Sequence, residues 1–318
     1  MKKYIILLLC LWGLTCCKKS PKVDGKKIKS AVTAVTSNSK KVAEKELGKP
    51  LEKAISVLSK ESRGYLLKVL GDNPKLLAFF KERPEFVSTW EYLRKYLPED
   101  CLNPEFLKMF IYANKYASYS GNKLENFVFK KSKDGLIEVF DKEGKHLLAT
   151  IKPGRVIEVV GNDVNNWFLQ LKPFPNSKYI INGAEYMTDD AGRIVASKAK
   201  LPLPVGNGTQ FRDGNVQKQM GKLKGSLQGD DAGHIIGNQF GGSSNMVNLV
   251  PMKGNVNKGV YKQMENEWRR AIDLGKKVDV EIKIKYPHQP KNCERPDWIE
   301  VIYDIDGQKV TKLIKNAA

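Results

Sequence analysis

Histidine and cysteine are scarce in this chain of 318 residues, which has three histidines and five cysteines. No Cys-x-x-Cys pair occurs, so there is little material for a zinc site, and a bound metal would be held mainly through oxygen. The glycine-rich stretch 221–242 does not continue as Gly-Lys-Ser or Gly-Lys-Thr, which excludes a phosphate-binding loop of the nucleotide-hydrolase type. The apolar run at residues 5–14 is too short to span a bilayer.

Acidic residues are few relative to basic ones: 54 Lys and Arg face 35 Asp and Glu, a formal charge of +19. A surface this basic attracts polyanions, chiefly nucleic acid and anionic membrane. The same charge also serves solubility, so by itself it assigns no chemistry.

The N-terminal residues indicate export. Two lysines precede the apolar run 5–14, which is followed by Cys16 and Cys17. This pattern is a secretory signal and resembles that of bacterial lipoproteins, with Cys16 or Cys17 carrying the lipid. We therefore expect an exported protein anchored to a bacterial membrane, on its periplasmic or outer surface. Cys101 and Cys293 remain as cysteines that could pair in an oxidising compartment, and the sequence leaves that open.

The chain has an α+β organisation. Apolar residues recur at helical spacing from Leu51, and Asn73 precedes Pro74 as a helix cap. Strand patterns begin near Phe127, and the run 167–171 continues them. We expect a signal peptide at 1–16, a basic tether at 17–50, a helical region at 51–122, a β-rich segment at 123–177 and a C-terminal domain with an antiparallel sheet at 178–318.

The C-terminal domain mixes helix and strand. The stretch 221–242 is expected to be a loop, and 258–274 has helical composition and ends at Gly275, a fitting C-cap. Residues 278–286 alternate apolar and polar, as in a strand with one wet face, and 298–313 suggest a final hairpin.

Four polar residues in this domain carry the chemistry by their type and order: His234, Asn248, Asn257 and Glu265. Phosphodiester hydrolysis needs a base that deprotonates water near neutral pH and a cation that stabilises the leaving oxygen. Each residue alone is more often a loop histidine, a turn, a helix cap or a solvated charge. On a straight helix Glu265 lies about 12 Å beyond Asn257, which favours contact with a shared ion through water.

Three motifs make the pattern specific: Asp231-Ala232-Gly233-His234, Asn248-Leu249-Val250-Pro251-Met252 and the segment from Asn257 to Glu265. Together they resemble the DNA/RNA non-specific endonucleases of the ββα-metal (His-Me finger) superfamily. The resemblance covers about residues 178–318 and is strongest to the branch found as toxin domains.

The resemblance implies a role for each residue. His234 is the general base, Asn257 directly binds one Mg²⁺ (Mn²⁺ being the alternative), Glu265 contacts the ion through water, and Asn248 supports the site. Ala232 stands where the wider family has arginine, so another cation must bind phosphate. The candidates are Arg212, Lys253 and Lys258.

These expectations describe a metal-dependent phosphodiesterase that cuts DNA, RNA or both without sequence specificity. Its role would be nutrient scavenging, defence or that of an antibacterial toxin neutralised by an acidic immunity protein. The alternative is a catalytically inactive lipoprotein that only binds nucleic acid. Salt-dependent binding without cleavage would indicate that alternative.

Overall fold

The computed structural model describes residues 43, 44, 46–95, 102, 104, 107, 126–152, 154–160, 166–170, 172–203, 214–289 and 293–316. The expected signal peptide, Cys16, Cys17, Cys101 and Arg212 lie outside these ranges. Within them, no helix is both long and apolar enough to cross a membrane. The chain divides into two compact units, Met1–Val87 and Ser88–Ala318.

The first unit is helical, as expected. Its helices begin within the segment expected to be a tether, because α3 starts at Lys49 and Ala43 and Leu47 are already buried. The side chain of Asn73 accepts a hydrogen bond from the Leu76 backbone N–H at 3.0 Å, which confirms the predicted cap. Its elements are α3 (Lys49–Ser56), α4 (Lys60–Asp72), α5 (Pro74–Glu82) and the 3-10 helix η1 (Pro84–Phe86). The next helix, α6 (Val87–Leu93), begins at the last residue of this unit and belongs mostly to the second.

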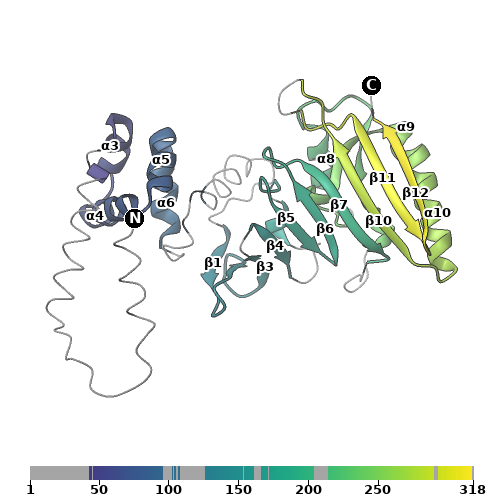
Figure 1. Cartoon of the computed structure of the whole chain (residues 1–318), viewed down its shortest axis with the longest axis horizontal. Helices are drawn as coiled ribbons and strands as arrows, with labels where there is room; N and C mark the ends of the chain where they lie inside the picture. The colour runs from purple at the N-terminus through teal and green to yellow at the C-terminus, as the bar shows by residue number, and fades with distance from the viewer. Residues whose placement is uncertain are drawn as a thin grey trace, which may run out of the picture. The chain divides into compact units, whose positions relative to one another are not determined.

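The second unit is built on a ten-stranded sheet in the order β1-β2-β3-β4-β5-β6-β7-β10-β11-β12 (Figure 1). Neighbouring strands are antiparallel except β4 and β5, which are parallel. The strands are β1 (Val128–Lys131), β2 (Ile137–Phe140), β3 (Leu147–Lys152), β4 (Val156–Val159), β5 (Lys178–Ile181), β6 (Ala184–Thr188), β7 (Ile194–Leu201), β10 (Val278–Lys285), β11 (Trp298–Ile305) and β12 (Gln308–Lys315).

The sheet joins two segments that the sequence suggested were separate. Strands β1 to β4 come from the expected β-rich segment, and β5 opens the expected C-terminal domain, yet β4 pairs with β5 through Val156, Ile157 and Glu158. The boundary expected at residue 178 therefore falls inside one continuous sheet.

The expectation of strand at 167–171 was wrong, because Trp167–Gln170 forms the 3-10 helix η6. Asn166 explains the difference. Its side chain accepts from the Phe168 N–H at 3.2 Å and donates to the Leu148 carbonyl at 2.7 Å, which starts a tight turn. Phe168 and the adjacent Leu169 are both buried, so they do not show the alternation of a strand with one exposed face.

Between β7 and β10 the chain leaves the sheet and returns. This excursion contains α8 (Gly214–Met220), the two-stranded sheet of β8 (Asp230–His234) and β9 (Leu249–Lys253), the 3-10 helices η7 (Asn238–Phe240) and η8 (Met246–Asn248), α9 (Gly254–Val256), η9 (Asn257–Tyr261) and α10 (Lys262–Asp273). The stretch 221–242, expected to be loop, thus contains a strand.

Helix α10 lies against the β10–β12 end of the large sheet (Figure 1). Trp268 is fully buried there, with its ring 5.6 Å from Tyr303 of β11 and 5.9 Å from Phe240. Burying side chains of this size provides much of the apolar stabilisation of a domain. This packing fixes the helix that carries Glu265 on the rigid sheet.

Candidate active site

His234 is the last residue of β8 and lies opposite Leu249 of β9. The sequence of β8, Asp-Asp-Ala-Gly-His, has little intrinsic preference for strand. Tertiary context forms it: β9 pairs along its whole length, and a Cβ at Gly233 would lie only 2.6 Å from the Cβ of the buried Met252. Glycine therefore lets the two strands pack closely immediately before the histidine.

Asn248 holds the segment that follows His234. It is fully buried, its Oδ1 accepts from the Ile236 N–H at 2.9 Å, and its Nδ2 donates to the carbonyls of Ile236 and Ser243 at 2.9 and 2.8 Å. The Asn248 backbone also binds the residue that follows β8, because the Ile235 N–H donates to the Asn248 carbonyl at 2.9 Å. Asn248 therefore fixes the backbone of the segment that follows His234.

The helix after β9 is not continuous, contrary to the expectation for 258–274. Residues 257–261 form a π-helical turn, and Gly259 has non-helical backbone angles of φ −99° and ψ −106°. π-helical turns inside helices frequently occur at functional sites. The straight-helix separation of Asn257 and Glu265 therefore does not apply here.

Tyr261 ties this turn to the strand of the histidine. Its hydroxyl donates to the Ile235 carbonyl at 2.5 Å, and burial, with the nearby Glu265 carboxylate, raises the pKa of the Tyr261 phenol. The phenol consequently stays protonated and keeps donating near neutral pH. This contact holds Asn257 and His234 in a fixed relation.

His234, Asn257 and Glu265 line one cavity of about 570 Å³. Three structural elements meet there: the end of β8, the π-helical turn and the first turn of α10. The remaining lining residues are mostly polar or basic: Ala232, Gly237, Asn238, Gln239, Lys258, Lys262 and Arg269. The sequence motifs thus bring these three residues together.

Asp231 orients two residues of the cavity. Its Oδ2 accepts from Asn257 Nδ2 at 3.1 Å, and its Oδ1 contacts Lys258 Nζ at 2.9 Å. Because the Asn257 amide nitrogen faces Asp231, the carbonyl oxygen of the same amide is left to act as a ligand. A carboxylate behind a ligand in this way commonly fixes its orientation.

Glu265 is largely buried, with a side chain that is 12% exposed. Its Oε2 accepts from Gln239 Nε2 at 3.4 Å and lies 3.6 Å from Lys262 Nζ. These contacts hold the Glu265 carboxyl group at the cavity wall.

The three phosphate-binding candidates have different positions. Lys258 lines the cavity, whereas Lys253 is not among the lining residues and Arg212 lies outside the described residues. Sequence reasoning missed Lys262 and Arg269, which also line it. Their spacing from Lys258 (four and eleven residues) together with Glu265 at seven is the helical repeat that could have identified them.

The donor atoms fit a hard cation. Among the described residues, no group of three or more His, Cys, Asp or Glu side chains could hold a metal ion. Asn257 and Glu265 instead offer amide and carboxylate oxygens, which suit Mg²⁺ that keeps most of its water. Cys293 is buried and is a free thiol in the described part of the chain.

Comparison with known proteins finds similarity in the C-terminal part of the chain. Residues 175–307 match the family model described as DNA/RNA non-specific endonuclease. Type VII secretion system protein EssD of Staphylococcus aureus (strain USA300) is 28% identical over 208 residues, 60% of this chain and 32% of that protein. Probable deoxyribonuclease RhsA of Dickeya dadantii (strain 3937) is 34% identical over 130 residues, 39% of this chain and 8% of that protein.

The chain therefore spans about a third of EssD and a much smaller part of RhsA. Among solved structures, NucA from Streptococcus agalactiae with magnesium ion bound matches with a TM-score of 0.35 and 16% identity, over 64% of this chain and 89% of that one. Residues 175–307 are therefore similar to the DNA/RNA non-specific endonuclease family.

Proposed function

We propose that this protein is an exported, metal-dependent endonuclease that hydrolyses DNA, RNA or both without reading their sequence. The observation that carries the proposal is the convergence of His234, Asn257 and Glu265 on one polar cavity. The family match of residues 175–307 supports the reaction class. Similarity to RhsA, a probable deoxyribonuclease, supports DNA as one substrate.

In the proposed reaction His234 removes a proton from water, which then attacks phosphorus in line with the departing 3′ oxygen. The histidine is suited to this role because β8 and β9 fix its backbone while its side chain reaches the cavity. Family resemblance leads us to expect products with 5′-phosphates.

Asn257 would hold one Mg²⁺ directly through Oδ1, and Glu265 would hold it through water. When bound, the ion supplies positive charge that stabilises the phosphorane and the departing oxygen. Asp231 contributes by keeping the Asn257 amide in one orientation.

Ala232 stands where the wider family has an arginine, so other basic side chains would supply the positive charge that binds phosphate. Lys258, Lys262 and Arg269 face the same cavity, and Glu265 is the acidic residue among its lining. Such a surface binds the sugar-phosphate backbone rather than base edges, which accounts for cleavage without sequence preference. Of the three phosphate-binding candidates Arg212, Lys253 and Lys258, it is Lys258 that lines the cavity.

The test compares the full-length wild type with His234→Ala on plasmid DNA and on a long RNA, in Mg²⁺, in Mn²⁺ and in EDTA. We expect metal-dependent cleavage by the wild type and none by His234→Ala. His288→Ala is the matched control, because His288 is exposed and is not a lining residue of the cavity. If the wild type only shifts nucleic acid in gels and never cuts it, the binding-lipoprotein alternative replaces the nuclease.

Export and membrane anchoring complete the proposal. The sequence pattern around Cys16 and Cys17 supports a lipid anchor, and similarity to EssD, a type VII secretion system protein, supports export. A Cys16→Ser/Cys17→Ser variant that leaves the membrane fraction but keeps its activity would support an anchor that sets location alone. Unchanged membrane association would argue against it.

The partner test addresses biological role. An acidic protein encoded next to this chain that binds it and blocks cleavage would favour the antibacterial toxin over scavenging or defence.

A further inference from the structure

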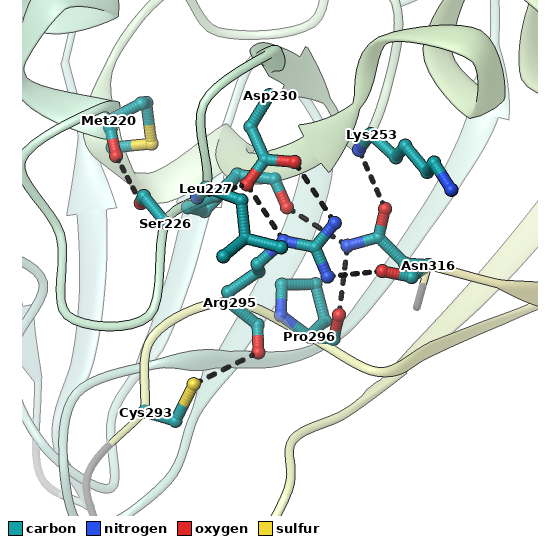
Figure 2. A network of polar contacts seen from close by, with 10 residues as sticks. Met220, Ser226, Leu227, Asp230, Lys253, Cys293, Arg295, Pro296 and Asn316 are labelled. Atoms are coloured by element: carbon teal, nitrogen blue, oxygen red, sulfur yellow. Dashed lines mark hydrogen bonds and ion pairs between the residues drawn. The ribbon is translucent and has the colours of Figure 1, made fainter. Parts of the chain in front are cut away.

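A buried polar network lies where the two-stranded sheet begins, outside the proposed catalytic cavity (Figure 2). Arg295 binds Asp230, the first residue of β8, in a bidentate fashion: Nε to Oδ2 at 2.7 Å and Nη2 to Oδ1 at 3.0 Å. The two side chains are 6% and 4% exposed. Arg295 Nη1 also donates to the backbone carbonyl of Asn316. Paired, charge-assisted contacts of this kind fix both distance and orientation.

Asn316 extends the network to the second strand. It is fully buried, its Oδ1 accepts from the Lys253 N–H at 2.8 Å, and its Nδ2 donates to the Pro251 carbonyl at 3.1 Å. The same Nδ2 donates to the Pro296 carbonyl at 2.8 Å. Because Asp230 pairs with Lys253 across the two strands, the network holds both at the same end.

This attachment matters because β8 and β9 are not hydrogen-bonded into the ten-stranded sheet. Arg295 and Asn316 flank β11 and β12, so they connect the two-stranded sheet to the rigid end of the large one. The residue after Asp230 is Asp231, which orients Asn257 and Lys258, and β8 ends at His234. A shift of β8 relative to the large sheet would therefore move His234 and Asp231 within the proposed catalytic cavity.

We propose that Arg295, Asp230 and Asn316 are positioning residues of the nuclease centre, setting where β8 places His234 and Asp231. This inference rests on the proposed function. It goes beyond a stabilising role, because it requires that loosening the network reduces turnover in protein that is still folded.

The decisive variant is Arg295→Lys in the full-length chain, which keeps the positive charge but cannot reproduce the fork that spans both Asp230 oxygens and the Asn316 carbonyl. Arg193→Lys is the matched control. Arg193 binds Asp189 through Nε and Nη2 at 2.7 and 2.6 Å and donates to the Cys293 carbonyl at 2.9 Å. Arg193 therefore also joins a carboxylate and a backbone carbonyl, although both of its nitrogens meet the single oxygen Oδ2 of Asp189, and it makes no hydrogen bond to β8 or β9.

Cleavage is measured well below the unfolding temperature of both variants. For Arg295→Lys we expect kcat to fall by about tenfold or more with KM changed by less than about threefold, and the Mg²⁺ concentration for half-maximal rate to rise. For Arg193→Lys we expect a kcat within about twofold of wild type. Equal kcat values in Arg295→Lys and wild type would overturn the inference and leave the proposed function intact.

Two further measurements keep the inference testable if Arg295→Lys folds poorly or the wild type does not cut. The Asp230→Leu/Arg295→Met variant buries no unpaired charge, so it should fold, yet it should show the same loss of kcat. Hydrogen exchange of residues 230–253 should quicken in the Arg295 variants and not in Arg193→Lys. This readout does not depend on activity, and unchanged exchange in the Arg295 variants would overturn the positioning role.

Discussion

Adding a methyl group at Gly237 should displace the Glu265 carboxylate without disturbing the fold. Gly237 has φ −55° and ψ 140°, which alanine adopts without strain. A Cβ built there would lie 2.1 Å from Glu265 Oε1 and 3.0 Å from its Cδ. Because such atoms rarely approach within about 3.0 Å, the oxygen must retreat by about 0.9 Å, the difference between 3.0 and 2.1 Å. The flexible end of the side chain can make that movement.

A shift of about 1 Å in a group that positions reactants can cost on the order of a hundredfold in rate. We therefore expect Gly237→Ala to lower kcat by roughly ten- to a hundredfold and to raise the Mg²⁺ requirement, with thermal stability nearly unchanged. Initial rates of plasmid cleavage over a Mg²⁺ titration measure both effects. Gly221→Ala is the control, because a Cβ there would lie 3.7 Å from the Lys218 carbonyl oxygen, an ordinary van der Waals distance.

A double-mutant cycle identifies the route of the effect. If the methyl group acts by displacing the carboxylate, Gly237→Ala should cause no further loss in a Glu265→Ala background. A loss of the same factor in both backgrounds would refute this reasoning, as would a Gly237→Ala enzyme with wild-type rate and Mg²⁺ dependence.

Three further changes test the supports of the site. Tyr261→Phe removes the hydrogen bond to Ile235 and should lower the free energy of unfolding by about 1–3 kcal/mol. Because burial raises the pKa of Tyr261, urea unfolding should show the same difference in this free energy between variant and wild type at every pH below about 10, and a smaller difference above it. Asn248→Ala leaves three buried backbone groups unpaired and should lower the free energy of unfolding by an amount on the order of 3–5 kcal/mol. A decrease below about 1 kcal/mol in the same urea assay would contradict a supporting role for Asn248. A fragment of residues 178–318 exposes the edge of β5 and should melt lower and aggregate more, by thermal unfolding and light scattering, than one of residues 126–318; equal behaviour would mean that the β4–β5 pairing contributes little.

The candidate site was largely predictable because its chemistry is encoded in residue types at short spacings. His234, Asn257 and Glu265 line one cavity, as their order in the sequence suggested. Their distances were not predictable, since the straight-helix estimate assumed regular geometry through Gly259, where a π-helical turn interrupts it. The contact between Arg295 and Asp230 joins positions 65 residues apart in the chain, so no local sequence pattern predicts it.

The fold was predictable where a local sequence pattern determines the element, such as an alternation of apolar and solvent-exposed residues or a helix cap. The alternating residues of β10 predicted their strand, and the cap at Asn73 predicted its helix. Sequence patterns failed at β8, where pairing overrides weak propensity, and at η6, where Asn166 starts a turn in an apolar run. The pairing of β4 with β5 depends on contacts between residues that are distant in the chain, and sequence composition does not predict such contacts.

The most direct test of the central claim is chemical rescue of His234→Ala with added imidazole, using full-length protein, plasmid DNA and Mg²⁺. A general base of this kind contributes about 10²–10⁴-fold, so the variant should lose nearly all activity. We predict that imidazole restores cleavage in proportion to its concentration, and that Asn257→Ala gains nothing from it. Cleavage by His234→Ala at the wild-type rate without imidazole would contradict the account.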